Sequence, residues 1–120
     1  MPKNTVVLGA SENPERYSFL ATQKLAAHQH PVTAIGIKAG IIDTTPIITE
    51  HPPIDNVDTV TLYLSPANQT AYYDYIISLH PKRLIFNPGT ENKELAMLAE
   101  ANGIEPIEAC TLVLLSTAQY

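Results

Sequence analysis

A short apolar run, Val6-Val7-Leu8, ends at Gly9, and a polar loop leads from this glycine into a helix that we expect over residues 17–29. Consecutive apolar residues without alternation are typical of a strand that is buried on both faces. A strand, a glycine-bearing turn and a helix in this order bring backbone N–H groups to the end of the strand, where they can hold an anion. The stretch 5–18 therefore predicts a buried strand and an anion-binding loop.

Further along the chain, apolar runs and helical patterns keep alternating. The pattern predicts strands at 32–37, 58–64, 83–87 and 104–107, the last at an edge, and helices at 68–79, 91–101 and 111–118. Residues 112–115 fit a strand as an alternative to the last helix. Residues 38–57 are too irregular for a helix, and we expect a crossing made of loop and short extended pieces. Ser18 and Thr90 are the residues predicted near the N-caps of their helices.

Strands that alternate with helices imply a parallel sheet with right-handed crossovers. The predicted fold class is α/β, a doubly wound Rossmann-like parallel sheet of about five strands with helices on both faces. The length of 120 residues, without a linker or repeat, predicts a single domain over residues 1–120.

The composition narrows the classes of partner. Twelve Asp and Glu against seven Lys and Arg give a net charge of −5, which does not supply the basic face of a nucleic-acid binder. One cysteine excludes an internal disulfide and fits a reducing compartment. No apolar stretch approaches the roughly 20 residues of a membrane span. We expect a cytoplasmic protein with a small-molecule nucleotide ligand, no nucleic acid and no membrane; a protein partner is left unidentified.

Doubly wound sheets bind ligands beyond the carboxyl ends of their strands, at the switch point of the strand order. That rule gathers four places in this chain: Gly9-Ala10-Ser11, Gly36-Ile37-Lys38, Ser65-Pro66 and Asn87-Pro88-Gly89. They are the candidate walls of one binding site.

The first of these loops departs from two known phosphate-binding patterns. The dinucleotide fingerprint needs three glycines, but only Gly9 is present, with Ser11 and Pro14 at the other two places, and no Gly-Lys-Ser/Thr of a P-loop follows. The Ser11 hydroxyl and the Arg16 guanidinium remain as groups that can grip a phosphate. An ordinary strand-to-helix turn with a solvated arginine is the alternative.

The residue at the end of the second strand helps to distinguish classes of nucleotide ligand. NAD-binding folds usually carry an acid there for the ribose diol, whereas this chain has Lys38. A lysine suits a ribose that bears a phosphate, as in NADP and coenzyme A. A solvated lysine at a strand end is the alternative.

Four pieces of the sequence, in order, resemble one family. They are Val7-Leu8-Gly9-Ala10-Ser11 with Pro14, Arg16, Tyr17 and Ser18; Asp58-Thr59-Val60 through Ser65-Pro66; Phe86 to Asn92 with Glu94-Leu95; and Ala101 to Ile104 followed by Cys110-Thr111-Leu112. Together they resemble the stand-alone coenzyme A-binding domain family, which is similar to the N-terminal domain of the succinyl-CoA synthetase alpha subunit.

The resemblance implies that Gly9, Ser11 and Arg16 face the diphosphate, that Lys38 lies near the ribose phosphate, and that the Ser65-Pro66 turn lies against the adenine. The full set of candidate cofactor-binding residues is Gly9, Ala10, Ser11, Arg16, Tyr17, Ser18, Gly36, Lys38, Ser65, Pro66, Asn87, Pro88 and Gly89.

The resulting hypothesis is non-catalytic binding of coenzyme A or an acyl-CoA through the Gly9 loop. Two alternatives stay open: an NADP-binding or NADP-sensing oxidoreductase-like protein, and a protein-interaction subunit with a vestigial pocket. We assign no catalytic residue and no metal ligand, because the four histidines lack zinc-ligand spacing and Cys110 fits a buried, packed thiol.

Overall fold

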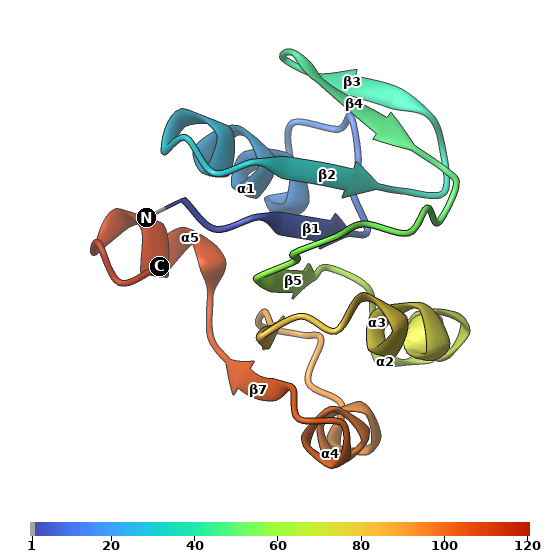
Figure 1. Ribbon diagram of the computed structural model, residues 1–120. Helices are drawn as coiled ribbons and strands as arrows, with labels where there is room; N and C mark the ends of the chain where they lie inside the picture. Colours follow the sequence, from blue (N-terminus) through green and yellow to red (C-terminus); the bar gives the residue numbers. More distant parts are fainter. Residues whose placement is uncertain (1) are drawn as a thin grey trace.

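The structure, a computed structural model, describes residues 2–120 and contains one seven-stranded sheet flanked by helices (Figure 1). The strands are β1 (Thr5–Leu8), β2 (Val32–Ile35), β3 (Gly40–Ile42), β4 (Thr45–Ile48), β5 (Thr59–Leu62), β6 (Arg83–Phe86) and β7 (Glu105–Glu108). Their order in the sheet is β3-β4-β2-β1-β5-β6-β7, and all neighbours are parallel except the antiparallel pair β3 and β4. The predicted α/β fold with a mostly parallel sheet is confirmed.

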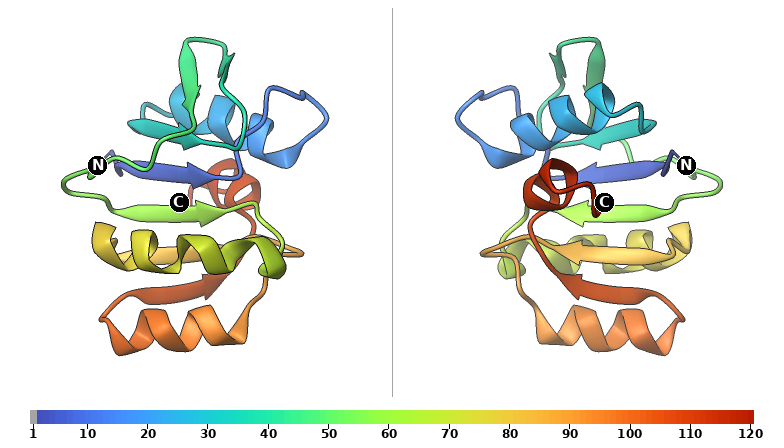
Figure 2. Two further views of the ribbon diagram at one scale, coloured as in Figure 1. Left: turned by 90° about the vertical axis from the view of Figure 1, so that its right-hand side faces the viewer. Right: turned by 90° about the vertical axis from the view of Figure 1, so that its left-hand side faces the viewer.

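The helices cover both faces of the sheet, as the two views in Figure 2 show. One face packs against α3 (Tyr73–Leu79) and α4 (Lys93–Ala101), and the other against α1 (Tyr17–Ala27) and α5 (Thr111–Ser116). The strand β1 is buried along its whole length, because successive side chains point to opposite covered faces. The unbroken apolar run at its centre is explained by this position.

The predicted number of about five strands is wrong, because the irregular stretch after β2 contains two more. Strands β3 and β4 form a hairpin at the sheet edge, turning at Asp43, whose φ of 53° is in the left-handed region. Each strand is short, and Pro46 lies inside β4, which is tolerated near an edge. These short pieces carry no clear periodicity in the sequence.

Helix boundaries also differ from the prediction in three places. The helix expected over 68–79 is divided into α2 (Pro66–Gln69), a 3-10 turn (Thr70–Tyr72) and α3. The N-cap of α4 is Asn92, whose side chain accepts from the Leu95 amide, whereas the Thr90 hydroxyl donates to the Asn87 carbonyl. Helix α1 is preceded by Arg16 at its N-cap, and Ser18 is already its second residue. The terminal segment is the helix α5, as predicted, and β7 is an edge strand.

Candidate functional site

A cleft of about 1050 Å³ opens at the carboxyl ends of the four central strands β2, β1, β5 and β6. The chain runs outward from β1 to β2 on one side and to β5 on the other, so the cleft lies at the switch point of the strand order. Its lining residues are Gly9–Asn13, Arg16–Ser18, Ile37, Lys38, Tyr63–Ser65, Asn68, Ala71, Tyr72 and Pro88–Thr90. All four loops that the sequence assigned to one site contribute at least one of them.

The loop after β1 is held against the sheet by its own backbone. The amides of Gly9 and Ala10 both donate to the Ile35 carbonyl, at 3.0 and 2.9 Å, so neither amide is free for a ligand. Gly9 has a φ of +94°, and a Cβ there would lie 3.0 Å from the backbone of Tyr63. Glycine is therefore required both by the conformation and by the close approach of the two loops.

The groups of this loop that could hold an anion lie in its later residues. The amides of Tyr17 and Ser18, in the first turn of α1, have no acceptor within residues 2–120. The Ser11 side chain lines the cleft and accepts from the Asn13 amide at 3.1 Å, which orders the turn. Free amides at a helix N-terminus, with the Arg16 side chain beside them, form a favourable environment for a phosphate.

Charge is distributed unevenly along the cleft. Among residues 2–120, its cationic lining residues are Arg16 and Lys38, and they stand on the loops after β1 and β2. Glu12, whose carboxylate also lines the cleft, accepts a 2.9 Å hydrogen bond from the Ile41 amide of the β3–β4 hairpin. In that part of the chain, the walls that follow β5 and β6 carry no charged lining residue. The cleft thus has a cationic end and an uncharged end.

Ten of the thirteen predicted binding residues line this cleft: Gly9, Ala10, Ser11, Arg16, Tyr17, Ser18, Lys38, Ser65, Pro88 and Gly89. Gly36, Pro66 and Asn87 do not. A Cβ on Gly36 would lie 2.4 Å from the Ala10 carbonyl oxygen, so glycine at this position permits the close approach of the first loop. Pro66 is the first residue of α2.

Asn87 is buried, and the protein itself uses its side-chain amide fully. Its Nδ2 donates to the Thr61 hydroxyl at 2.6 Å and to the Leu62 carbonyl at 2.8 Å, and its Oδ1 accepts from the Thr111 amide at 2.9 Å. These contacts join β5, β6 and the start of α5 beneath the cleft.

The sequence did not identify several lining residues, above all Tyr63, Leu64, Asn68 and Tyr72. Ile37 belongs to the predicted wall Gly36-Ile37-Lys38 but was not among the candidate binding residues, although it lines the cleft and is 91% exposed. The Tyr63 hydroxyl is buried without a hydrogen-bond partner within residues 2–120, and burial raises the pKa of this phenol above its usual value. A neutral phenol therefore stands in the wall after β5.

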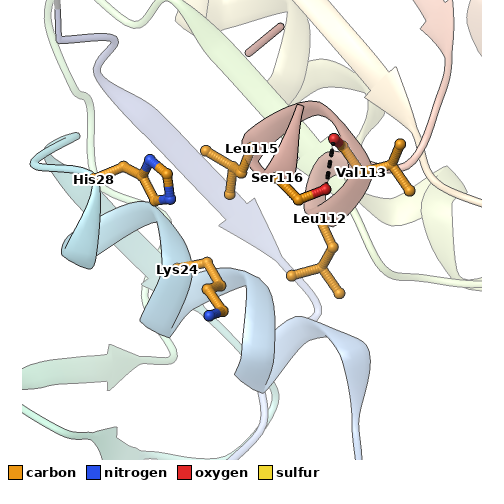
Figure 3. A pocket seen from close by; sticks show the side chains of 6 residues that line it. All are labelled: Lys24, His28, Leu112, Val113, Leu115 and Ser116. Atoms are coloured by element: carbon orange, nitrogen blue, oxygen red, sulfur yellow. Dashed lines mark hydrogen bonds between the residues drawn. The ribbon is translucent and has the colours of Figure 1, made fainter. Parts of the chain in front are cut away.

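A second, smaller hollow of about 330 Å³ lies between α1 and α5 and shares no lining residue with the cleft (Figure 3). Leu112, Val113 and Leu115 of α5 line it together with Lys24 of α1 and His28, the C-cap residue of α1. Ser116 bonds back to the Val113 carbonyl of its own helix at 3.1 Å.

Two further findings concern residues 2–120. No helix there is long and apolar enough to cross a membrane. No group of three or more His, Cys, Asp or Glu side chains in that range is arranged to hold a metal ion.

The fold and the cleft at its switch point define a Rossmann-like ligand-binding domain. Over residues 3–116 the sequence matches the family described as the CoA binding domain, and the chain belongs to that family. None of the curated proteins is significantly similar to it in sequence.

Solved structures show the same fold. A crystal structure of an uncharacterized protein is 49% identical, with a TM-score of 0.97 over 100% of this chain and 99% of that one. A hypothetical protein from Pyrococcus horikoshii OT3 is 22% identical, with a TM-score of 0.84 over 97% of this chain and 83% of that one. A protein from Thermus thermophilus is 16% identical, with a TM-score of 0.86 over 99% and 91%. The latter two likenesses concern the fold alone.

Proposed function

We propose that the cleft binds coenzyme A or an acyl-CoA and that the chain acts as a non-catalytic binding module. The observation that carries the proposal is the uneven charge of the cleft: Arg16, Lys38 and the hydrogen-bonded Glu12 stand at one end, and within residues 2–120 no charged residue lines the other. The charge of coenzyme A is distributed in a matching way: a diphosphate and a ribose phosphate lie at one end, and a long uncharged pantetheine arm lies at the other.

The proposed ligand orientation follows from this match. Arg16, the Ser11 hydroxyl and the amides at the start of α1 hold the diphosphate, and Lys38 holds the ribose phosphate. The adenine lies against Ser65, in agreement with the family resemblance. The pantetheine arm extends between the walls after β5 and β6, past Leu64 and Thr90.

Thermal shift measurements with coenzyme A, acetyl-CoA and dephospho-CoA test the proposal. A ligand that binds only the native state raises stability by mass action, so the melting temperature should rise with coenzyme A concentration. No shift at about a thousand times a micromolar dissociation constant, where about 4 kcal/mol is expected, would exclude the proposed ligand.

Lys38 gives the sharper test. Lys38→Ala should weaken coenzyme A by about tenfold, the effect of one lost charge-assisted hydrogen bond at an exposed site, and leave dephospho-CoA unchanged. Lys82→Ala is the matched control, because Lys82 is also exposed but precedes β6, at the opposite end of the strands. Equal weakening of both ligands in Lys38→Ala would contradict the assigned role.

NADP is the second candidate ligand, and Lys38 favours it for the same reason, since NADP also bears a ribose phosphate. Fluorescence titration of NADPH separates the two candidates. An unchanged NADPH spectrum together with a coenzyme A shift supports the first, and the reverse result supports the second.

A further inference from the structure

Gln69 is a polar side chain at 0% exposure beside the cleft, and none of the ligand contacts above uses it. It is the last residue of α2. Its Nε2 donates to the Leu64 carbonyl at 2.9 Å and to the Thr90 carbonyl at 2.8 Å, and its Oε1 accepts from Asn92 Nδ2 at 2.9 Å. The buried amide therefore has a partner for each donor and for its oxygen.

The two carbonyls that Gln69 binds belong to opposite walls. Leu64 lies on the loop after β5 and Thr90 on the loop after β6, and both residues line the cleft. One side chain thus spans the uncharged end of the cleft and links its two walls by hydrogen bonds at both sides. Loops linked only through solvent would vary in separation, whereas this bridge fixes it.

The Gln69 side chain is also connected to helices α3 and α4 through Asn92. Asn92 caps α4 by accepting from the Leu95 amide at 3.2 Å, and its Nδ2 also donates to the Tyr73 hydroxyl at 2.8 Å. The Tyr73 hydroxyl donates in turn to Glu94 at 3.0 Å. The position of Gln69 is therefore set by both α3 and α4, which are packed against the sheet.

We propose that Gln69 is a positioning residue that holds the β5 and β6 walls at the separation needed by the uncharged arm of the ligand. This inference rests on the proposed function. A flexible pantetheine arm loses conformational freedom on binding, and walls that are already fixed reduce the free energy that ordering requires. Gln69 does not touch the ligand; it acts through Leu64 and Thr90.

The test compares coenzyme A with adenosine 3′,5′-bisphosphate, which keeps the adenine, the ribose phosphate and the inner phosphate of the diphosphate but lacks the outer phosphate and the pantetheine arm. Gln69→Met keeps the length and removes all three hydrogen bonds. We expect calorimetry to show coenzyme A weakened by about tenfold or more, because only a fraction of molecules keeps the competent wall spacing. The bisphosphate should be weakened much less, because its adenine touches only the β5 wall. Asn102→Ala is the control, since it removes a 2.9 Å amide bond to the Leu98 carbonyl at the far end of α4.

A second variant keeps the inference testable if Gln69→Met is poorly folded. In Gln69→Glu an ionised carboxylate would face two carbonyl oxygens, whereas the protonated acid can donate to one of them. Burial raises the pKa of the introduced carboxyl, so its coenzyme A affinity, taken relative to the unchanged protein, should recover as the pH falls from about 8 to about 6.

The outcomes are distinct. Selective loss of coenzyme A affinity in Gln69→Met, with recovery at lower pH in Gln69→Glu, supports the positioning role. Equal loss for both ligands, or no loss for coenzyme A in folded variants, overturns it while the proposed function stands. If the unchanged protein binds neither ligand, the proposed function fails, and the inference fails with it.

Discussion

Truncation of Asn87 distinguishes a residue that contacts the ligand from one that holds the site in place. In Asn87→Ala, three hydrogen bonds of 2.6, 2.8 and 2.9 Å disappear from a side chain that is 2% exposed. At about 1 kcal/mol net for each of the two bonds that Nδ2 donates, the loss is about 2 kcal/mol. The Thr111 amide at the start of α5 also loses its acceptor, and a buried donor without a partner costs about 1–3 kcal/mol.

We therefore expect Asn87→Ala to lower the free energy of unfolding by about 3–5 kcal/mol, a large part of the roughly 5–15 kcal/mol of a typical domain. The assay is urea unfolding followed by far-UV circular dichroism or tyrosine fluorescence, since the chain has six tyrosines and no tryptophan. The comparison variant is Asn68→Ala. Asn68 is exposed, lines the cleft and donates only to the Ser65 hydroxyl at 3.0 Å, so its loss should change stability by less than about 0.5 kcal/mol.

Coenzyme A binding is then measured on the folded fraction of both variants. An Asn87→Ala protein that unfolds at the same urea concentration as the unchanged chain, yet no longer binds coenzyme A, would refute the reasoning. That result would mean that the amide faces the ligand, in contradiction to its three internal partners.

Two more predictions follow from residues away from the ligand contacts. Gly36→Ala should destabilise the fold by about 1–3 kcal/mol and weaken coenzyme A binding, because the new Cβ would meet the Ala10 carbonyl oxygen at 2.4 Å and push the first loop outward. Gly103→Ala, with a φ of +74° and open space around it, should cost about 1 kcal/mol of unfolding free energy without affecting binding; equal binding by both variants would contradict this argument. Burial, with the nearby charge of Lys3, lowers the pKa of His30, whose Nδ1 accepts from the Lys3 amide at 2.9 Å. Above about pH 6.5 the imidazole is neutral in both the folded and the unfolded chain. As the pH decreases below this value, the unfolded chain is protonated first, so the free energy of unfolding should decrease until the pH reaches the lower pKa of the folded chain. His30→Gln should reduce this slope in urea unfolding measured across the window, and an identical slope would count against it.

Strands that are buried on both faces are the clearest part of the fold to predict from sequence, although β2 and the edge strand β7 were predicted as well. Apart from Arg83, the residues of β1, β5 and β6 are apolar or β-branched because helices cover these strands on each side, and their runs stand out between polar loops. The β3–β4 hairpin could not be found in this way. It is short, lies at the sheet edge and contains Pro46, so neither alternation nor a continuous apolar run marks it.

In the candidate site, the loops could be predicted from the sequence, but the orientations of individual side chains could not. The rule that ligands bind at the carboxyl ends of parallel strands places whole loops, and it gathered all four correctly around one cleft. It cannot say which side chain of a loop turns toward the cleft and which turns beneath it. Asn87 and Pro88 are neighbours in the chain, but Pro88 lines the cleft while Asn87 turns inward to Thr61 and Thr111.

The contacts that Gln69 and Gly36 make beside the cleft could not be predicted from sequence for a related reason. Gln69 is separated by 21 residues from Thr90, whose carbonyl it binds, and its neighbours in sequence suggest only an exposed helix. Gly36 looked like a ligand contact, although its role depends on the Ala10 carbonyl on another strand's loop. In both cases the determining contact is made across parallel strands that the chain reaches only after a crossover. Local sequence therefore indicates where a ligand can bind, whereas the arrangement of the cleft walls depends on long-range hydrogen bonds and close backbone contacts.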